Sequence, residues 1–271
     1  MSLPSYMPIS CLPMFFRTLA VQPRFMWALY ILLAILLAPP AAVAGLYASR
    51  IRFSKRLVAQ TKAAQSSPQS CRRTIVVAGD STAFGVGALP AETTAGRIAA
   101  AYPHARVINV AKSGSRVGHV VDQLDSVDIA SADLVLIHAC ANDVLEFRSV
   151  EKFDRDLRDA ITRARRISPN VVLMPGHNFS VAPFFLRPIS WFVARHALRI
   201  HAIVKSVTNE LGILFVDLIG TTHEVPFLQE PRRYYCPDGL HPSGEGYAIW
   251  FAALIAQVPL ARFLAEQTGS D

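Results

Sequence analysis

Residues 74–87, TIVVAGDSTAFGVG, decide the fold of this 271-residue chain. They begin with an apolar run at residues 75–77, which is too short and too apolar for anything but a buried strand. The run breaks into a sharp polar turn, Gly-Asp-Ser, at residues 79–81. In an α/β sheet, ligands bind at the carboxyl ends of the strands, where loops and helix N-termini form a crevice. The sequence therefore predicts that the hydroxyl of Ser81 is exposed at that edge of the sheet. A serine in this position has the geometry that a nucleophile needs to reach a bound ligand.

From residue 74 onward, short apolar segments alternate with amphipathic ones. We expect strands at residues 74–78, 106–110, 134–138, 171–174 and 213–217, and helices at residues 91–101, 117–124, 150–167, 189–211 and 243–258. This alternation predicts a parallel sheet with right-handed crossovers, in a flavodoxin-like three-layer α/β/α sandwich.

Two further segments place polar groups at the ends of expected strands. Gly114 follows the second strand, where its N–H would point into the site as an oxyanion donor, or where the glycine only serves a tight turn. Asn142 follows the third strand, where its amide would donate to a developing oxyanion, or would cap the next helix. Taken singly, each segment leaves both interpretations open.

The last polar segment, CPDGLHP, covers residues 236–242 and precedes the final expected helix. Pro242 fits the start of that helix, which fixes His241 just ahead of it. Asp238 is close enough in sequence to orient His241 and to stabilise its protonated form.

In their order and at these strand ends, the four segments resemble the SGNH (GDSL-type) hydrolases, a family of serine esterases. The resemblance covers residues 74 to about 258. It implies no cofactor and no metal. It assigns a role to five residues: Ser81 as nucleophile, His241 as general base, Asp238 as its orienting acid, and the N–H groups of Ser81 and Gly114 with the side-chain amide of Asn142 as the oxyanion hole.

One residue departs from the family pattern. The third block of the family usually reads Gly-x-Asn-Asp, and Cys140 occupies the glycine position here. The thiol adds bulk beside the Asn142 loop. Because Asn142 itself is present, we expect activity to survive.

The N-terminal part contains an apolar segment at residues 25–48, long enough to span a bilayer, although Pro39 and Pro40 are expected to kink or end its helix. One interpretation is a signal peptide cleaved near Ala44, after which the protein is exported. The other is a retained single-pass anchor. We favour the anchor because the basic flank at residues 50–62 impedes translocation, and the side of the membrane stays open.

Charge is distributed unevenly along the chain. Residues 1–73 carry nine of the 27 basic residues and no acidic residue, which leaves 18 basic and 20 acidic residues in the remainder. The near-neutral remainder argues against a nucleic-acid partner, whereas the basic segment suits anionic lipid headgroups or serves only as a topology signal.

We divide the chain into a tail (1–24), a membrane or signal segment (25–48), a polar linker (49–73) and a hydrolase domain (74–271).

The cysteines show no metal-type spacing, and the histidines other than His241 form no ligand cluster on this reading. Export of the domain would allow Cys71 and Cys236 to pair, but free, buried thiols are the favoured interpretation.

The aromatic stretch at residues 179–203 either packs its helix onto the sheet or forms an apolar lip for an acyl chain or the bilayer.

Taken together, these features predict a membrane-tethered serine ester hydrolase acting on a small-molecule or lipid acyl ester. Two alternatives remain, an O-acetyl esterase acting on a cell-envelope glycan and a catalytically idle binding module. The complete residue set argues against idleness.

Overall fold

A computed structural model describes residues 23–176 and 179–265. Most of the predicted tail (1–24), with Cys11, lies outside these residues, as does His177, one of the histidines expected to form no ligand cluster. The chain separates into two compact units, one ending at Ser49 and one beginning at Arg50.

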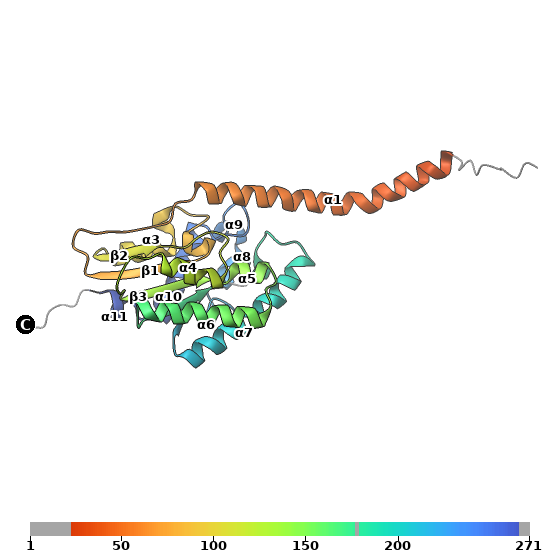
Figure 1. Cartoon of the computed structure of the whole chain (residues 1–271). Helices are drawn as coiled ribbons and strands as arrows, with labels where there is room; N and C mark the ends of the chain where they lie inside the picture. The colour runs from red at the N-terminus through yellow and green to blue at the C-terminus, as the bar shows by residue number, and fades with distance from the viewer. Residues whose placement is uncertain (1–22, 177–178, 266–271) are drawn as a thin grey trace, which may run out of the picture. The chain divides into compact units, whose positions relative to one another are not determined.

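A five-stranded sheet, parallel throughout, forms the centre of the second unit (Figure 1). Its order is β2-β1-β3-β4-β5, the doubly wound order of flavodoxin-like folds. The strands are β1 (Arg73–Gly79), β2 (Ala105–Asn109), β3 (Leu134–Ala139), β4 (Val171–Pro175) and β5 (Leu214–Phe215). The predicted α/β/α fold is confirmed. Only β5 is clearly shorter than expected, because Asp217 turns the chain by accepting a hydrogen bond from the Ile219 N–H.

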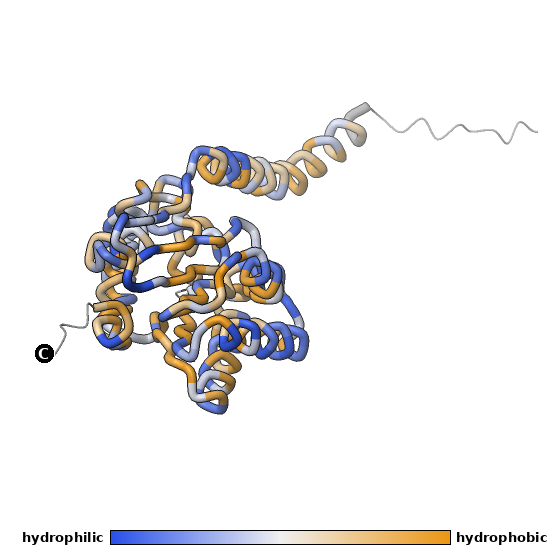
Figure 2. The backbone as a smooth tube through the Cα atoms, turned by 60° about the vertical axis from the view of Figure 1, so that its left-hand side comes forward, coloured by the Kyte–Doolittle hydropathy of each residue, from blue (hydrophilic) through white to orange (hydrophobic). Residues whose placement is uncertain are grey.

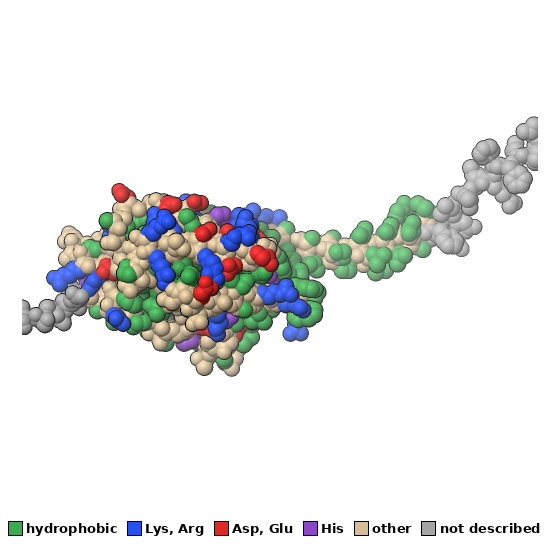
Figure 3. All heavy atoms as spheres, turned by 60° about the horizontal axis from the view of Figure 1, so that its bottom comes forward, with side chains coloured by type: hydrophobic (Ala, Val, Ile, Leu, Met, Phe, Trp, Pro, Cys, Tyr) green, Lys and Arg blue, Asp and Glu red, His purple; other side chains and the backbone are tan. Residues whose placement is uncertain are grey.

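Helices cover both faces of the sheet. Alternate side chains of each strand enter two separate cores, as Val76 and Ile75 of β1 do. One core lies under α4 (Val120–Asp125), α6 (Val150–Ile167) and α7 (Ile189–Leu211), and the other under α3 (Thr94–Ala101), α10 (Gly244–Gln257) and α11 (Leu260–Leu264). Figure 2 shows the apolar strands enclosed between helices of mixed hydropathy. On the face seen in Figure 3, basic and acidic side chains are interspersed.

Short helices at the ends of strands escaped the sequence analysis because a helix of four or five residues carries no readable period. They are α2 (Ser81–Phe84), α5 (Ala141–Leu145), α8 (Val225–Gln229) and α9 (Pro231–Tyr234). The first two continue directly from β1 and β3, so they position the residues that follow these strands.

Helix α1 (Pro23–Gln60) contains the apolar N-terminal segment. Within it, residues 26–60 contain an 18-residue window that is apolar enough to cross a membrane, and no residue of that window is buried. Of the two effects expected of the prolines, a kink or an end of the helix, the end does not occur, because α1 runs through Pro39 and Pro40.

The expected polar linker at residues 49–73 is also different in the structure. Its first part is the end of α1, and Ser66 forms an antiparallel bridge with Val107 on the outer edge of β2. An edge strand has unpaired N–H and C=O groups that a passing segment can satisfy, which explains how a polar stretch without periodicity becomes fixed here. The second compact unit begins at Arg50, so it includes these residues.

Candidate active site

Ser81 is the first residue of α2, directly after β1. Asp80 caps this turn, since its Oδ1 accepts hydrogen bonds from Thr82 N (2.9 Å) and Thr82 Oγ1 (2.7 Å). Gly79 has φ = 148°, and a Cβ there would lie 1.9 Å from the carbonyl oxygen of His138. Only glycine therefore allows β1 to approach β3 this closely at the point where Ser81 emerges.

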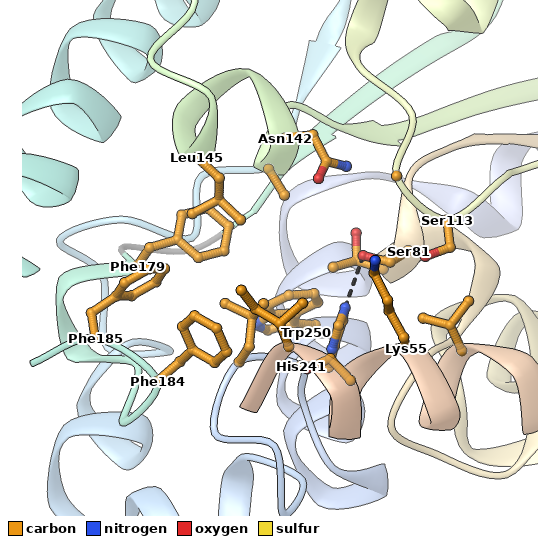
Figure 4. A pocket seen from close by; sticks show the side chains of 17 residues that line it. Lys55, Ser81, Ser113, Asn142, Leu145, Phe179, Phe184, Phe185, His241 and Trp250 are labelled. Carbon is orange, nitrogen blue, oxygen red and sulfur yellow. Dashed lines mark hydrogen bonds between the residues drawn. The ribbon is translucent and has the colours of Figure 1, made fainter. Parts of the chain in front are cut away.

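A chain of hydrogen bonds joins three of the predicted residues, Ser81, His241 and Asp238. Figure 4 shows the bond between His241 and Ser81. His241 Nε2 lies 3.0 Å from Ser81 Oγ, and His241 Nδ1 lies 2.6 Å from Asp238 Oδ2. All three residues are buried, with exposed fractions of 8% or less. The arrangement allows a proton to pass from the serine to the imidazole while the carboxylate holds the opposite ring nitrogen.

The turn at residues 236–241 explains the placement of Asp238. Its Oδ1 accepts from Leu240 N (2.8 Å), His241 N (3.0 Å) and the Cys236 thiol (3.0 Å). Burial opposes ionisation of Asp238, but the hydrogen bond and charge of His241, with the bond from Cys236, outweigh it and hold its pKa below the usual range.

Gly114 and Asn142 line the same pocket as Ser81. Gly114 has φ = 84°, and a Cβ there would meet open space, so the backbone conformation and not crowding favours glycine. Asn142 Nδ2 donates one hydrogen to Ser115 O (2.8 Å), which fixes the side chain and leaves its second hydrogen available. Asp80 Oδ2 accepts from Ala141 N (3.0 Å), which ties the Asn142 loop to the serine turn.

Two residues beside Asn142 have unusual environments. Cys140 is buried with φ = 92°, a left-handed backbone conformation that glycine adopts freely but that is unusual for a residue with a side chain. Burial, with the nearby charges of Asp143 and Asp80, raises the pKa of its thiol well above the usual value. Burial likewise raises the pKa of Asp143 to about 6, although its Oδ2 accepts from Val117 N.

The pocket has a volume of about 470 Å³ and is mostly apolar. Figure 4 shows Phe179, Phe184 and Phe185 on the side away from Ser113. The complete lining is Ile51, Ser54, Lys55, Val58, Ser81, Thr82, Ser113, Gly114, Ala141, Asn142, Leu145, Phe179, Phe184, Phe185, Leu240, His241 and Trp250.

The aromatic stretch therefore divides between the two interpretations. Phe184 and Phe185 line the pocket, whereas Trp191 and Phe192 on α7 do not and are 66% and 54% exposed.

The sequence analysis missed the contribution of α1. Ile51, Ser54, Lys55 and Val58 line the pocket, and Ser54 Oγ donates to Asp238 Oδ2 at 2.8 Å. Their spacing of three, one and three residues is that of one helix face and was the available signal. It was overlooked because the polar residues after Gln60 led to the whole stretch being interpreted as a linker.

The cysteines with described positions are free thiols. Cys71 is exposed next to the start of β1, whereas Cys236 is buried and donates to Asp238, so these two do not pair. Within residues 23–176 and 179–265, no group of three or more His, Cys, Asp or Glu side chains is arranged to hold a metal ion.

Comparison with known proteins places this geometry in context. A family model described as the GDSL-like lipase/acylhydrolase family matches residues 77–249. No curated protein matches the chain significantly.

Several solved structures share the fold. A member of the lipolytic G-D-S-L family from Veillonella parvula is 16% identical, with a TM-score of 0.55 over 68% of this chain and 96% of that one. An acetylxylan esterase from Geobacillus stearothermophilus is 20% identical, with a TM-score of 0.52 over 74% and 99%. An extracellular lipase from Streptomyces rimosus is 18% identical, with a TM-score of 0.54 over 69% and 100%.

Proposed function

Because this chain belongs to the GDSL-like lipase/acylhydrolase family and is a carboxylic ester hydrolase, we propose that it is a membrane-tethered serine esterase that cleaves acyl esters. The observation that carries this proposal is the hydrogen-bonded chain Ser81–His241–Asp238, buried at the carboxyl edge of the sheet.

In the proposed reaction, Ser81 Oγ attacks the ester carbonyl while His241 Nε2 accepts the hydroxyl proton. The carbonyl oxygen becomes an oxyanion, which the N–H groups of Ser81 and Gly114 and the free amide hydrogen of Asn142 stabilise. His241 then gives its proton to the departing alcohol. Water, activated by His241 in the same way, releases the acid and regenerates Ser81.

The pocket composition supports an acyl chain as the acid part of the ester. The three phenylalanines, Leu145 and Trp250 offer an apolar surface next to Ser81. Each methylene buried there would contribute about 0.8 kcal/mol to binding. A short acetyl group would leave most of this surface unused.

We further propose that residues 25–48 are retained as the anchor, supported by the length and apolar composition of α1. The full-length protein should then remain in the membrane fraction after alkaline carbonate extraction. Recovery of a mature chain beginning at Gly45 would establish the signal-peptide alternative.

The catalytic assignment is tested with the full-length protein in detergent. Ser81→Ala should abolish ester hydrolysis and labelling by a fluorophosphonate, because the nucleophile is lost and kcat falls by several orders of magnitude. Ser113→Ala is the matched control, since Ser113 lines the same pocket but is not the serine bonded to His241; labelling should persist. Undiminished turnover by Ser81→Ala would refute the assignment.

A further inference from the structure

The last turns of α1 form one wall of the active-site pocket. The pocket-lining residues Ile51, Ser54, Lys55 and Val58 recur at the spacing of a single helix face. They lie outside residues 77–249, the part of the chain that the family model matches. The pocket is thus completed by an element that precedes the family domain.

Arg50 fastens this wall to the loop after β4. Its guanidinium donates to the carbonyl oxygens of Pro183 (3.0 Å) and Phe184, and lies 5.9 Å from the centroid of the Phe184 ring. Phe184 also lines the pocket. The helix end is therefore attached on one side to the apolar part of the site.

Ser54 attaches it to the catalytic part. Its Oγ donates to Asp238 Oδ2 at 2.8 Å, and the same oxygen receives His241 Nδ1 at 2.6 Å. Asp238 Oδ1 meanwhile accepts three hydrogen bonds from its own turn. Among the described residues, Ser54 is the donor that holds Oδ2 besides His241, so it limits the rotation of the carboxylate against the imidazole.

We propose that Ser54 is a positioning residue of the esterase, acting through Asp238 to keep His241 aligned with Ser81. This inference rests on the proposed function. A carboxylate that is fixed through hydrogen bonds to both oxygens does not have to reorient when the imidazole gains a proton and becomes charged. Without the Ser54 hydroxyl, Oδ2 keeps only its bond to His241 while the three bonds to Oδ1 remain, so the carboxylate is held less firmly on the side of the imidazole. His241 Nε2 then spends less time within reach of Ser81.

The test uses full-length variants in detergent and a soluble medium-chain ester. Ser54→Ala should lower kcat about 5- to 20-fold with little change in KM, because a hydrogen bond to a charged group is lost but no acyl contact is. Ser54→Thr keeps a hydroxyl and should recover most of the rate. Val58→Ala is the matched control on the same helix face, and it should raise KM rather than lower kcat.

A double-mutant cycle ties the effect to its partner. In an Asp238→Asn background, Ser54→Ala should have a much smaller effect on kcat than it has alone. Undiminished kcat in Ser54→Ala, or a loss that persists in full in the Asp238→Asn background, would overturn the proposal. The proposed function fails separately, if Ser81→Ala keeps its activity.

A different observation, the charge of the pocket, points to the alcohol part of the substrate. Lys55 is the lining residue with a permanent charge, and its side chain is exposed. Figure 4 shows it extending along the same side of the pocket as Ser81. No acidic residue lines the pocket, so an anionic group bound there would face an uncompensated ammonium.

We infer that the preferred ester carries an anionic headgroup, such as a phosphate, on its alcohol part, with its acyl chain toward the phenylalanines. This too rests on the proposed function. The ammonium would attract the headgroup while the apolar wall takes the chain, so that the ester bond between them lies near Ser81.

The test compares two esters with one acyl chain, 1-decanoylglycerol and 1-decanoylglycerol 3-phosphate, in neutral detergent. Wild type should prefer the phosphate by about tenfold in kcat/KM, and the preference should shrink at high salt. Lys55→Glu should abolish it. Arg52→Glu makes the same charge change on an exposed residue of the same helix that does not line the pocket, and should largely preserve it. The inference would be overturned if Lys55→Glu and Arg52→Glu lost the preference for the phosphate ester equally, or if the wild type preferred the neutral ester.

Discussion

Replacing Cys140 by alanine and by glycine tests whether its backbone is strained. Cys140 has φ = 92° and ψ = −9°. A side chain in the left-handed region costs roughly 1–2 kcal/mol, whereas glycine adopts it freely. Both substitutions remove the buried thiol, but only glycine also removes the strain. The difference between the two variants therefore isolates the backbone contribution.

The expected difference follows from two opposing quantities. Relative to Cys140→Ala, the Cys140→Gly variant gains about 1–2 kcal/mol in its free energy of unfolding because the backbone strain is relieved. It loses about 0.5–1 kcal/mol of the same quantity because glycine makes the unfolded chain more flexible. Cys140→Gly should accordingly be more stable than Cys140→Ala by about 1 kcal/mol, which corresponds to about 2–4 °C in Tm for a domain of this size. At an ordinary strand or helix position the alanine variant is instead more stable than the glycine variant.

The assay is thermal unfolding of the full-length variants in detergent, followed by tryptophan fluorescence. Ala139, the last residue of β3 and buried, is the matched control, because Ala139→Gly should lower Tm. Ester hydrolysis by Cys140→Gly should persist, since Asn142 is retained. A Cys140→Ala protein more stable than Cys140→Gly would refute the left-handed conformation at this residue.

Three further predictions concern the site and its surroundings. Asn142→Ala should lower kcat about a hundredfold with little change in Tm, as expected for one oxyanion donor, and an unchanged rate would remove Asn142 from the hole. Burial raises the pKa of Asp143 to about 6, so its contribution to stability is present below about pH 4 and is lost as pH rises through 6. Between pH 4 and pH 7, Asp143→Asn should therefore lose less of its free energy of unfolding, measured in urea, than the wild type loses. Parallel curves of stability against pH for the two proteins would contradict this. In a p-nitrophenyl series from acetate to decanoate, kcat/KM should stay level or rise with chain length, and Phe185→Ser should weaken the response to long chains; a steep fall after acetate would favour the O-acetyl esterase alternative.

Much of the fold was predictable because the strands are short apolar runs that both faces of a parallel sheet must bury. Ser81, Asp238 and His241 were predictable for a related reason. Each follows a strand or precedes the last helix, so the topology alone brings them to one edge of the sheet.

The wall formed by α1 was not predictable in the same way. The partners of Arg50 and Ser54 lie more than 130 residues away, at Phe184 and Asp238, and no local pattern encodes such a contact. Ser66 was missed for the same reason, because its pairing depends on the free edge of β2.

The long sequence separations in the site have a consequence for synthesis of the enzyme. Ser54 and Asp238 are 184 residues apart, and Ser81 and His241 are 160 apart. At about 5–20 residues per second, a ribosome needs roughly 10–40 seconds to travel from Ser54 to Asp238. During that time Ser81 of the nascent chain has no His241 beside it. Under the proposed function, a chain released early stays inert, and hydrolysis begins only after the turn at residues 236–241 has folded against α1.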